Sequence, residues 1–434
     1  MRKSLNLSGS LGFCAVERPW GHAPSYIQRE VHYDPLAMVR TGNFGNPATR
    51  NHNRTVTGAL GEGAISLKAE AMTLFPAIRL LGFLAALSIL GVDANRRTLR
   101  EQAEQSGRLI GAAARSSQLN EPLYAMTLAR EFNLLEPEDE LKWEIVHPDV
   151  TRFDFVRGDR LVMFARMHGL KVRGHTLVWH HQIPPWLADG QFSPAQLHHL
   201  LEDHIRTVME HYRGQVFAWD VVNEAFDENG QLRSTIWSSR PGIGVGTGTA
   251  YIETALRWAH AADPDAHLFL NDAECETVNR KSDAMYRVLQ DFKQRRVPLD
   301  GIGFQMHVSD LNPDFSGIAA NIRRFAALGF EVQITEMDVA VPVDASGRPW
   351  HLEDVARQAE IYRKIAAICF SEARCTALQM WGFTDQYSWI RSSTHGAKGA
   401  ALPFDSNYAP KAAYFGLRDG LAVPSAYPPK ASAR

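Results

Sequence analysis

Short apolar runs alternate with longer amphipathic stretches along the chain from Leu99 onward. Apolar runs rich in β-branched residues are typical of parallel strands that are buried on both faces. The amphipathic stretches predict helices, and Ser193 is placed to cap one of them with Pro194 at its first helical position. The apolar runs are 109–114, 132–135, 171–178, 216–222, 267–270, 301–308, 332–339 and 377–383, and the helix-like stretches include 194–212, 251–262, 280–295 and 352–370.

Eight alternations of strand and helix over about 320 residues predict an α/β fold, a (β/α)8 TIM barrel. A doubly wound open sheet is the main structural alternative. We find no internal repeat and no low-complexity linker, so a single catalytic domain accounts for the pattern. The resulting division is 1–71 as an uncertain leader, 72–94 as a signal peptide, 95–421 as the barrel and 422–434 as a loose C-terminal tail.

An apolar run at 80–92, preceded by Arg79, indicates export. The run is too short for a membrane span, which needs about 20 residues. It fits the core of a signal peptide, and residues 92–94 (Val-Asp-Ala) supply small side chains at the cleavage spacing. A buried helix of the folded domain is the alternative. Because a signal peptide stands at the N-terminus, we expect translation to start at Met72, with 1–71 a mis-assigned start or a leader, and the mature protein to be secreted to the periplasm or the medium.

Polar or aromatic side chains follow six of the apolar runs, always at the C-terminal end of the run. In a barrel these ends open onto the active-site face, so the side chains are expected to converge on one cleft. A polar group in an apolar strand costs stability unless it is paired, and six such ends together predict a site. The residues are Asn223 and Glu224, Glu336 and Asp338, His175, Gln305 and His307, Asn271 and Asp272, and Trp381.

Two of these side chains, Glu224 and Glu336, are carboxylates on facing strands of the predicted barrel. Such a pair is the arrangement that hydrolyses glycosides. One carboxylic acid protonates the leaving oxygen, which requires a raised pKa, and the other stays ionised and attacks the anomeric carbon. For either residue alone, a surface or salt-bridged carboxylate is the alternative. We expect the two carboxyl groups to lie about 5–5.5 Å apart, the spacing of enzymes that retain configuration.

Eight segments of the sequence occur together in an order that resembles glycoside hydrolase family ten. They are 138–143 (EDELKW), 173–182 (RGHTLVWHHQ), 219–224 (WDVVNE), 271–272 (ND), 303–307 (GFQMH), 334–338 (ITEMD), 381–385 (WGFTD) and 410–414 (PKAAY). The resemblance covers roughly Leu99 to Leu421. It implies a retaining endo-β-1,4-xylanase that acts on xylan or xylo-oligosaccharides and needs no cofactor.

The resemblance also implies a role for each matching side chain. Glu224 resembles the acid/base and Glu336 the nucleophile. Asn223 is similar to the partner of the sugar 2-hydroxyl, and His307 to the partner of the nucleophile, oriented by Asp338. The implied glycone-side contacts are Glu138, Lys142, His175, Trp179, Gln182 and Gln305, and Trp381 and Trp389 are the implied walls of the −1 subsite.

Two positions depart from the family pattern. Asp139 stands where the family usually has Asn, at a glycone-side hydrogen-bonding position, and an ionised Asp accepts hydrogen bonds without donating any. Ala273 stands where members commonly carry an aromatic residue that stacks on the aglycone sugar, a loss on the order of 1 kcal/mol. These changes bear on chain-length preference and xylan type, while the chemistry is expected to be unchanged.

The four cysteines leave the disulfide pairing open when they are only counted. Cys14 lies in the leader and Cys275 stands alone, while Cys369 and Cys375 are close enough to close a short loop or to remain two buried thiols. The pair Cys369 and Cys375 resembles a short-loop disulfide of many family members, which favours a bridge, as does export.

Charge and the remaining motifs predict no further ligand. The formal net charge of −2 gives no electrostatic reason to expect nucleic acid or a membrane as partner. The glycines at 242, 244, 246 and 248 lack the spacing of a nucleotide loop and predict a flexible loop. The cluster of His198, His199, Asp203 and His204 fits a solvated helix face better than a metal site, so we expect no bound metal. We also expect the protein to be a monomer.

Two other functions compete with a xylanase. A retaining β-1,4-glucanase of the same barrel type has the same glutamate pair, but the segments 138–143 and 381–385 favour xylan. A non-catalytic carbohydrate-binding barrel is a rival of another class. Intact Glu224 and Glu336 argue against it.

Overall fold

The computed structural model describes residues 97–422. The predicted leader with Cys14, the predicted signal peptide at 72–94 and the tail beyond Ala422 lie outside the described residues. Within 97–422, no helix combines the length and the apolar character needed to cross a membrane.

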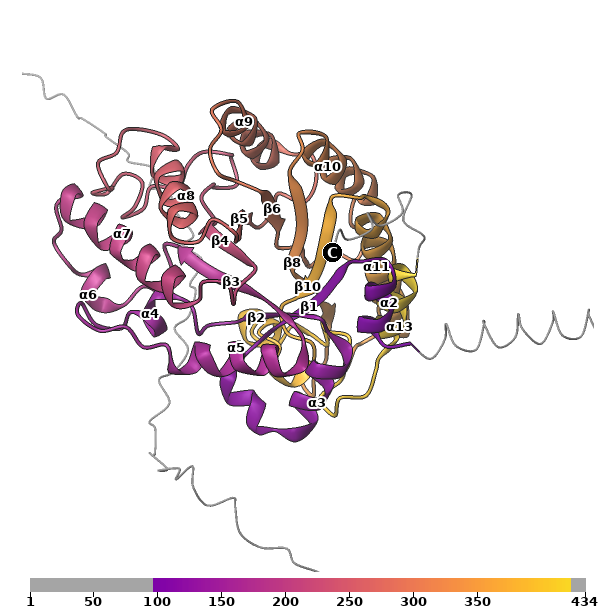
Figure 1. Ribbon diagram of the computed structural model, residues 1–434. Coiled ribbons are helices and arrows are strands. Elements are labelled where there is room, and N and C mark those ends of the chain that lie inside the picture. Colours follow the sequence, from indigo (N-terminus) through magenta and orange to yellow (C-terminus); the bar gives the residue numbers. More distant parts are fainter. Residues whose placement is uncertain (1–96, 423–434) are drawn as a thin grey trace, which may run out of the picture. The chain divides into compact units, whose positions relative to one another are not determined.

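Parallel strands and helices alternate along the described chain, and the helices lie outside the strands in Figure 1. The barrel strands are β1 Leu109–Ala114, β2 Leu134–Pro137, β3 Lys171–Val178, β4 Ala218–Asn223, β5 His267–Asp272, β6 Gly301–Phe304, β8 Glu331–Val339 and β10 Cys375–Met380. The short strands are β7 His307–Val308, β9 Val341–Pro342 and β11 Lys398–Gly399.

The eight barrel strands of residues 97–422 form a closed sheet. They pair in the order β10-β1-β2-β3-β4-β5-β6-β8, and β10 also pairs with β8, so this sheet has no open edge. Every one of these pairings is parallel. The predicted (β/α)8 barrel is therefore confirmed, and the doubly wound sheet is excluded because it would leave two edge strands unpaired.

The helices match the amphipathic stretches closely. Ser193 caps its helix by accepting a hydrogen bond from the backbone N–H of Gln196, whose side chain bonds back to Ser193, a capping box. The helices are α2 Leu99–Gln105, α3 Pro122–Glu131, α4 Trp143–Val146, α5 Val156–His168, α6 Pro185–Ala188, α7 Pro194–His211, α8 Ala250–Ala262, α9 Arg280–Gln294, α10 Phe315–Ala327, α11 Leu352–Ser371, α12 Ile390–Ser393 and α13 Ala412–Leu421, with 3-10 turns η1 Ser116–Asn120 and η2 Asp385–Tyr387.

One predicted strand is divided in the structure. The apolar run 301–308 becomes β6 and β7, and Gln305 and Met306 lie between these two strands. Met306 has a φ of 68°, and its N–H donates to Glu276 Oε1 at 3.0 Å rather than to a neighbouring strand. The break turns Gln305 and His307, the two polar residues of this run, towards the cleft.

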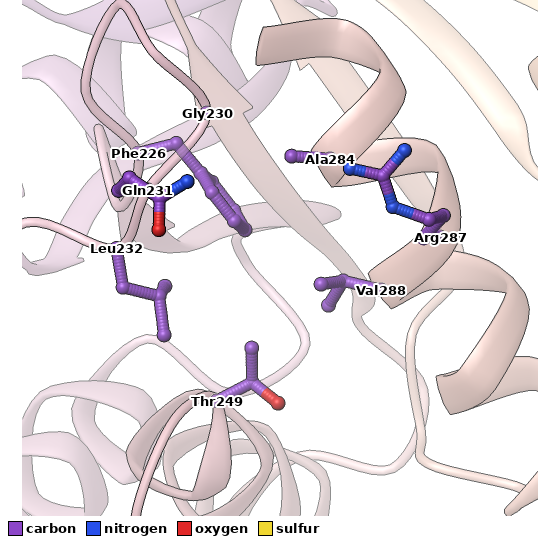
Figure 2. A pocket seen from close by; sticks show the side chains of 8 residues that line it. All are labelled: Phe226, Gly230, Gln231, Leu232, Thr249, Ala284, Arg287 and Val288. Atoms are coloured by element: carbon purple, nitrogen blue, oxygen red, sulfur yellow. The ribbon is translucent and has the colours of Figure 1, made fainter. Parts of the chain in front are cut away.

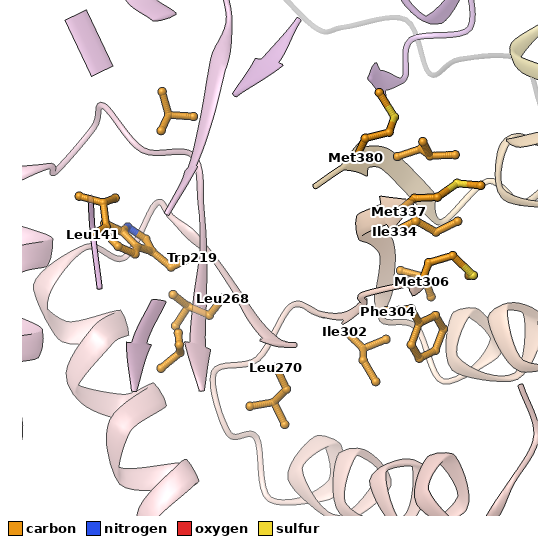
Figure 3. Close-up of a cluster of buried hydrophobic side chains, with 14 of the residues drawn as sticks. Leu141, Trp219, Leu268, Leu270, Ile302, Phe304, Met306, Ile334, Met337 and Met380 are labelled. Atoms are coloured by element: carbon orange, nitrogen blue, oxygen red, sulfur yellow. The ribbon is translucent and has the colours of Figure 1, made fainter. Parts of the chain in front are cut away.

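The outer faces of the strands pack against the helices through large apolar side chains, some of which Figure 3 draws. Trp219 on β4 is fully buried, and its indole lies across Gly174 of β3. A Cβ at Gly174 would stand 2.3 Å from that ring, so only glycine fits beneath it.

The inside of the barrel holds a buried charged cluster instead of an apolar plug. Arg173 of β3 forms an ion pair with Asp220 of β4, and its Nε lies 3.8 Å from Glu136 of β2. All three side chains are fully buried. Burial and the neighbouring Asp220 raise the pKa of Glu136 well above its ordinary value. Removing one partner of such a cluster lowers the free energy of unfolding by about 3–5 kcal/mol. The intact cluster therefore stabilises the barrel interior beneath the site.

Cys369 and Cys375 form a disulfide, with Cα atoms 5.2 Å apart, so the favoured bridge is confirmed. The bond joins the last turn of α11 to the first residue of β10. It therefore lies at the N-terminal end of the barrel strands, away from the face on which the polar strand ends meet. Cys275 is buried and is bonded to no other cysteine within residues 97–422.

Replacing both disulfide cysteines with alanine is expected to lower the free energy of unfolding by about 2 kcal/mol, the loop-closure entropy of a short loop. Turnover at room temperature should be unchanged because the bond lies at the other end of the strands. Urea unfolding of the wild type, the double variant and the reduced wild type checks this. Equal midpoints for all three proteins would show that the bond contributes nothing to stability.

Candidate active site

The backbone of the barrel holds Glu224 and Glu336 at the C-terminal ends of two strands. Glu224 follows β4, and its N–H donates to the carbonyl of Asn271 at 2.9 Å. With a φ of 52°, Glu224 turns out of the strand direction at this point. Glu336 lies within β8, and its N–H donates to the carbonyl of Gln305 at 2.9 Å. Ladder bonds between neighbouring strands therefore position both carboxylates.

Three side-chain amides connect the two carboxylates. Gln305 Nε2 donates to Glu224 Oε1 at 3.1 Å and to Asn223 Oδ1 at 3.3 Å. Asn271 Nδ2 donates to the same Asn223 oxygen at 3.0 Å and to Glu336 Oε1 at 2.7 Å. Because one oxygen of Asn223 receives a donor from each side, Glu224 and Glu336 border a common site.

His307 bonds Glu336 on its other side. Its Nε2 lies 3.3 Å from Glu336 Oε2, and its Nδ1 lies 2.9 Å from Asp338 Oδ2. Both ring nitrogens thus face carboxylates, an environment that favours the doubly protonated ring. Burial opposes the charge, but Asp338 and Glu336 raise the pKa of His307 well above its ordinary value. Trp389 Nε1 also donates to Asp338 Oδ2, at 2.9 Å, so the orienting carboxylate is itself held in place.

The pKa of Glu224 differs from the sequence-based expectation. We expected a raised pKa for the acid. Burial does favour the neutral form, but hydrogen bonds from Gln305 and Trp179, with His180 and His181 nearby, hold the pKa of Glu224 below its ordinary value. Two N–H donors aimed at the carboxylate outweigh its burial in the ligand-free site.

A second cluster surrounds Lys142 beside the carboxylates. Lys142 Nζ donates to Gln182 Oε1 at 2.7 Å and to Asp139 Oδ1 at 3.1 Å. The same ammonium lies 5.2 Å from the ring centroid of Trp179 and 5.4 Å from that of Trp381. Lys142 is buried, unlike an ordinary surface lysine.

Trp179 joins the two clusters, since its Nε1 donates to Glu224 Oε2 at 3.0 Å. His175 lies beneath them: its Nδ1 is 3.0 Å from Asp220 Oδ2 of the barrel interior, and its ring meets Trp381 edge-on with centroids 5.4 Å apart. Hydrogen bonds, ion pairs and ring contacts thereby connect the residues to which the resemblance gave a role, with Glu138 joined through Arg115. Their individual roles in substrate binding and catalysis remain predictions.

Arg115 contacts Asp139, the residue at which the chain departs from the family pattern. Its Nε lies 3.0 Å from Asp139 Oδ2, and a terminal nitrogen lies 2.8 Å from Glu138 Oε1. Burial opposes ionisation, but Lys142 and Arg115 hold the pKa of Asp139 below its ordinary value. The Asp at this position therefore forms ion pairs on both sides. Ala273 directly follows β5, and its effect on the leaving-group side stays a prediction.

The sequence reasoning did not name two contributors, Arg115 and Glu136, and it gave a third, Asn271, no role of its own. Asn271 was expected at the cleft as a strand-end residue, and it bonds Glu336 directly. Arg115 and Glu136 lie at the ends of β1 and β2, and applying the strand-end rule to those strands would have found them. The sequence contains no such indication of the charged barrel interior, because Arg173 and Asp220 lie within runs that are otherwise mostly apolar.

The His-rich stretch on α7 is arranged differently from the expectation. His198, His199 and Glu202 are close enough to share an ion, whereas Asp203 does not join them. His204 is fully buried and stacks on Trp143 with ring centroids 3.6 Å apart. The buried His204 is thus part of the core.

A separate hollow lies outside the carboxylate site. Figure 2 shows it between the segment after β4 and helix α9, with Thr249 at the edge. Its lining includes Phe226, Leu232 and Val288 and none of the candidate residues. The glycines at 242–248 adopt positive φ angles, as expected of a loop.

Two buried carboxyls make the folded protein sensitive to pH. Burial raises the pKa of Glu138 to about 7 against the opposing Arg115. Burial likewise raises the pKa of Asp272 to about 7 against Lys281. Since these folded values exceed the unfolded ones, the folded state binds more protons. The associated stability is fully present below the unfolded pKa and is lost as the pH rises through the folded pKa.

We therefore expect the free energy of unfolding to fall between about pH 5 and about pH 8, and the fall to be smaller in Glu138→Gln by on the order of 2 kcal/mol. Urea unfolding across this range measures the slope. Glu144→Gln, at an exposed position of the neighbouring helix α4, is the matched control and should follow the wild type. A Glu138→Gln slope parallel to the wild type would contradict the assignment.

Comparison with known proteins gives matches over the barrel. The family model described as "Glycosyl hydrolase family 10" matches residues 98–420. Endo-1,4-beta-xylanase B of Thermotoga neapolitana is 42% identical over 324 residues, 74% of this chain and 90% of that relative. Native xylanase 10B of Thermotoga maritima superposes with a TM-score of 0.70 at 41% identity, covering 75% of this chain and 98% of that one. Xylanase 10B of Thermotoga petrophila RKU-1 in complex with xylobiose gives a TM-score of 0.70 at 41% identity, covering 75% and 97%.

Proposed function

Because the chain belongs to glycosyl hydrolase family 10, we propose that it is an endo-1,4-β-xylanase that cleaves internal bonds of xylan with retention of configuration. The observation that carries this proposal is the amide network that links Glu224 and Glu336 around one site. The relatives named as xylanases and the neighbour bound to xylobiose support xylan as the substrate class.

In the first step, a Glu336 oxygen attacks the anomeric carbon while the bond to the leaving oxygen breaks and Glu224 gives its proton to that oxygen. The charged His307 and the Asn271 amide hold Glu336 in place as the carboxylate. In the second step, Glu224 takes a proton from water, whose oxygen bonds to the anomeric carbon and releases Glu336. Asn223 uses its Oδ1 within the network, which leaves its Nδ2 to donate to the sugar 2-hydroxyl.

In this mechanism, substrate binding raises the pKa of Glu224 so that it can act as the acid. The ligand-free site lowers the pKa of Glu224 through two N–H donors. A sugar ring bound against Glu224 excludes water and competes for these donors, and both changes favour the protonated carboxyl. We propose a carboxyl separation of about 5–5.5 Å, the spacing of retaining enzymes.

The glycone side of the cleft is built from Lys142, Gln182 and the indoles of Trp179 and Trp381. Aromatic faces suit pyranose rings, while the ammonium and amide groups suit hydroxyls. Asp139 is held between Arg115 and Lys142. Sugar hydroxyls at this position therefore meet the acceptor oxygens of Asp139 and the ammonium of Lys142, which Asp139 also binds. An asparagine would instead offer one acceptor oxygen and an N–H donor.

The proposal is tested by reducing-sugar release from arabinoxylan and from carboxymethyl-cellulose, with at least about a tenfold preference for xylan expected. Proton NMR of the first products of an aryl β-xylobioside should show the β-anomer before mutarotation. Comparable release from cellulose would favour the glucanase, and an α-anomer would reject retention. A wild type as inactive as Glu336→Ala would leave only a binding protein.

We further propose that the protein is made with the signal peptide 72–94, starting at Met72, and that it is secreted as a monomer. The apolar run at 80–92 supports export. N-terminal sequencing of the native protein should find the mature chain beginning near residue 95. A mature chain that retains Met1 would reject this start and this signal peptide.

A further inference from the structure

Two consecutive histidines stand beside the carboxyl group of Glu224. His180 and His181 follow β3, and Glu224 follows the adjacent strand β4. One ligand atom from each of the three residues lies within 4.8 Å of the others. His181 is exposed and His180 and Glu224 are half-buried, so the group is open to solvent from one side.

The donor set is one that binds zinc. Two imidazoles and one carboxylate are the ligands of several zinc enzymes, with solvent at the fourth position. His180 Nδ1 is also buried with no hydrogen-bond partner among the described residues. An unpartnered buried nitrogen of this kind calls for a ligand or a structural explanation.

We propose that His180, His181 and Glu224 bind one Zn²⁺ ion and that the bound ion inhibits the enzyme by occupying its acid/base carboxylate. The inhibitory half rests on the proposed function, since it takes Glu224 as the acid/base. A Zn²⁺ ion on Glu224 repels the proton that the glycosidic oxygen requires. It also competes with the leaving group for the same oxygen atoms.

The geometry needs a small adjustment to take the ion. Ligand atoms around tetrahedral zinc lie about 3.3–3.5 Å apart, given bonds of about 2.0–2.2 Å. The present spread of up to 4.8 Å therefore has to contract by up to about 1.4 Å. Exposed His181 has the freedom to move. Glu224 accepts one donor on each oxygen, from Gln305 and Trp179, and a carboxylate has lone pairs left for a metal.

Two other groups of the described residues have ligand atoms within the same limit, and neither fits as well. Glu136, His175 and Glu336 are buried inside the barrel, where Asn271 and His307 already bind Glu336. His198, His199 and Glu202 lie on the surface of α7, away from the carboxylate site, so an ion there would leave the chemistry unchanged. The α7 group therefore provides an internal control.

The test compares the wild type, His181→Asn and His199→Asn. Zn²⁺ alone is titrated by calorimetry in a non-coordinating buffer near pH 7, and xylan hydrolysis is followed over the same Zn²⁺ range with a chelator reversal. We expect the wild type to bind Zn²⁺ and lose activity reversibly. His181 lies beside Glu224, and its ring meets that of Trp179 edge-on with centroids 5.3 Å apart, so the inhibition of His181→Asn is measured relative to that variant's own zinc-free activity. Its inhibition constant should rise by at least about tenfold, as even outer partners of a metal site contribute 10–100-fold.

His199→Asn should be inhibited like the wild type, and Mg²⁺, which prefers oxygen ligands, should not replace Zn²⁺. Equal inhibition of the wild type and His181→Asn overturns the site, as does an absence of inhibition in the wild type. If the chain proves to have no xylanase activity, the calorimetry still tests the metal site separately. Loss of binding in His181→Asn then supports the site while the proposed function fails.

Discussion

Replacing Glu336 with alanine is expected to lower kcat on xylan by about five orders of magnitude, because the covalent glycosyl-enzyme no longer forms. This loss corresponds to about 7 kcal/mol of transition-state stabilisation. The pocket left by the carboxylate has room for a small anion, which attacks the anomeric carbon from the same face. With an activated aryl β-xylobioside, added azide should restore turnover and give the α-glycosyl azide, whose configuration NMR reads directly.

A matched control stands on the same strand. Glu331 begins β8, and its side chain contacts His267 and Thr376 at the end of the barrel opposite the site. Glu331→Ala should therefore keep its activity even if it loses some stability. Circular dichroism and the unfolding midpoint check that Glu336→Ala is folded. A folded Glu336→Ala with more than about a hundredth of wild-type activity would remove Glu336 from the nucleophile's role.

The sequence predicted the parts of this molecule that follow from local periodicity. Buried parallel strands need apolar side chains on both faces, so the eight barrel strands of residues 97–422 stand out as apolar runs. The polar residue that ends each run is necessarily at the open face of the barrel. The sequence therefore placed Glu224, Glu336 and His307 at strand ends on this face. The family resemblance, which rests on eight segments of the sequence, is confirmed.

Features that depend on contacts between distant segments were not predicted. The lowered pKa of Glu224 arises from donors that β3 and the end of β6 bring to it, and neither strand's own sequence indicates this convergence. The position of Arg115 after β1 could be read from the sequence, but its ion pair with Asp139 could not. The split of the run 301–308 depends on Glu276, which comes from another loop. Residues distant in the sequence set the protonation of Glu224 and the division of the run 301–308 into two strands. The periodicity of the sequence carries no information about such distant partners.

Replacing Glu224 with alanine is expected to have an effect that depends on the leaving group. On xylan, whose sugar leaving group needs a proton, kcat should fall by about three orders of magnitude, the contribution of a general acid. On an aryl β-xylobioside with an acidic phenol, formation of the glycosyl-enzyme needs no acid. The intermediate then accumulates, because water has lost its base. A burst of phenol followed by slow turnover should therefore be seen.

Added azide should speed the slow phase of Glu224→Ala and give the β-glycosyl azide, the opposite configuration to that from Glu336→Ala, because azide attacks the intermediate on the face that Glu224 leaves open. Glu228→Ala is the matched control, since Glu228 is exposed in the loop after β4 and its side chain accepts a hydrogen bond from the adjacent Asn229. An equal loss on xylan and on the activated substrate would show that Glu224 positions the sugar without transferring a proton. The two azide products together separate the two carboxylates, because each variant exposes one face of the same anomeric carbon.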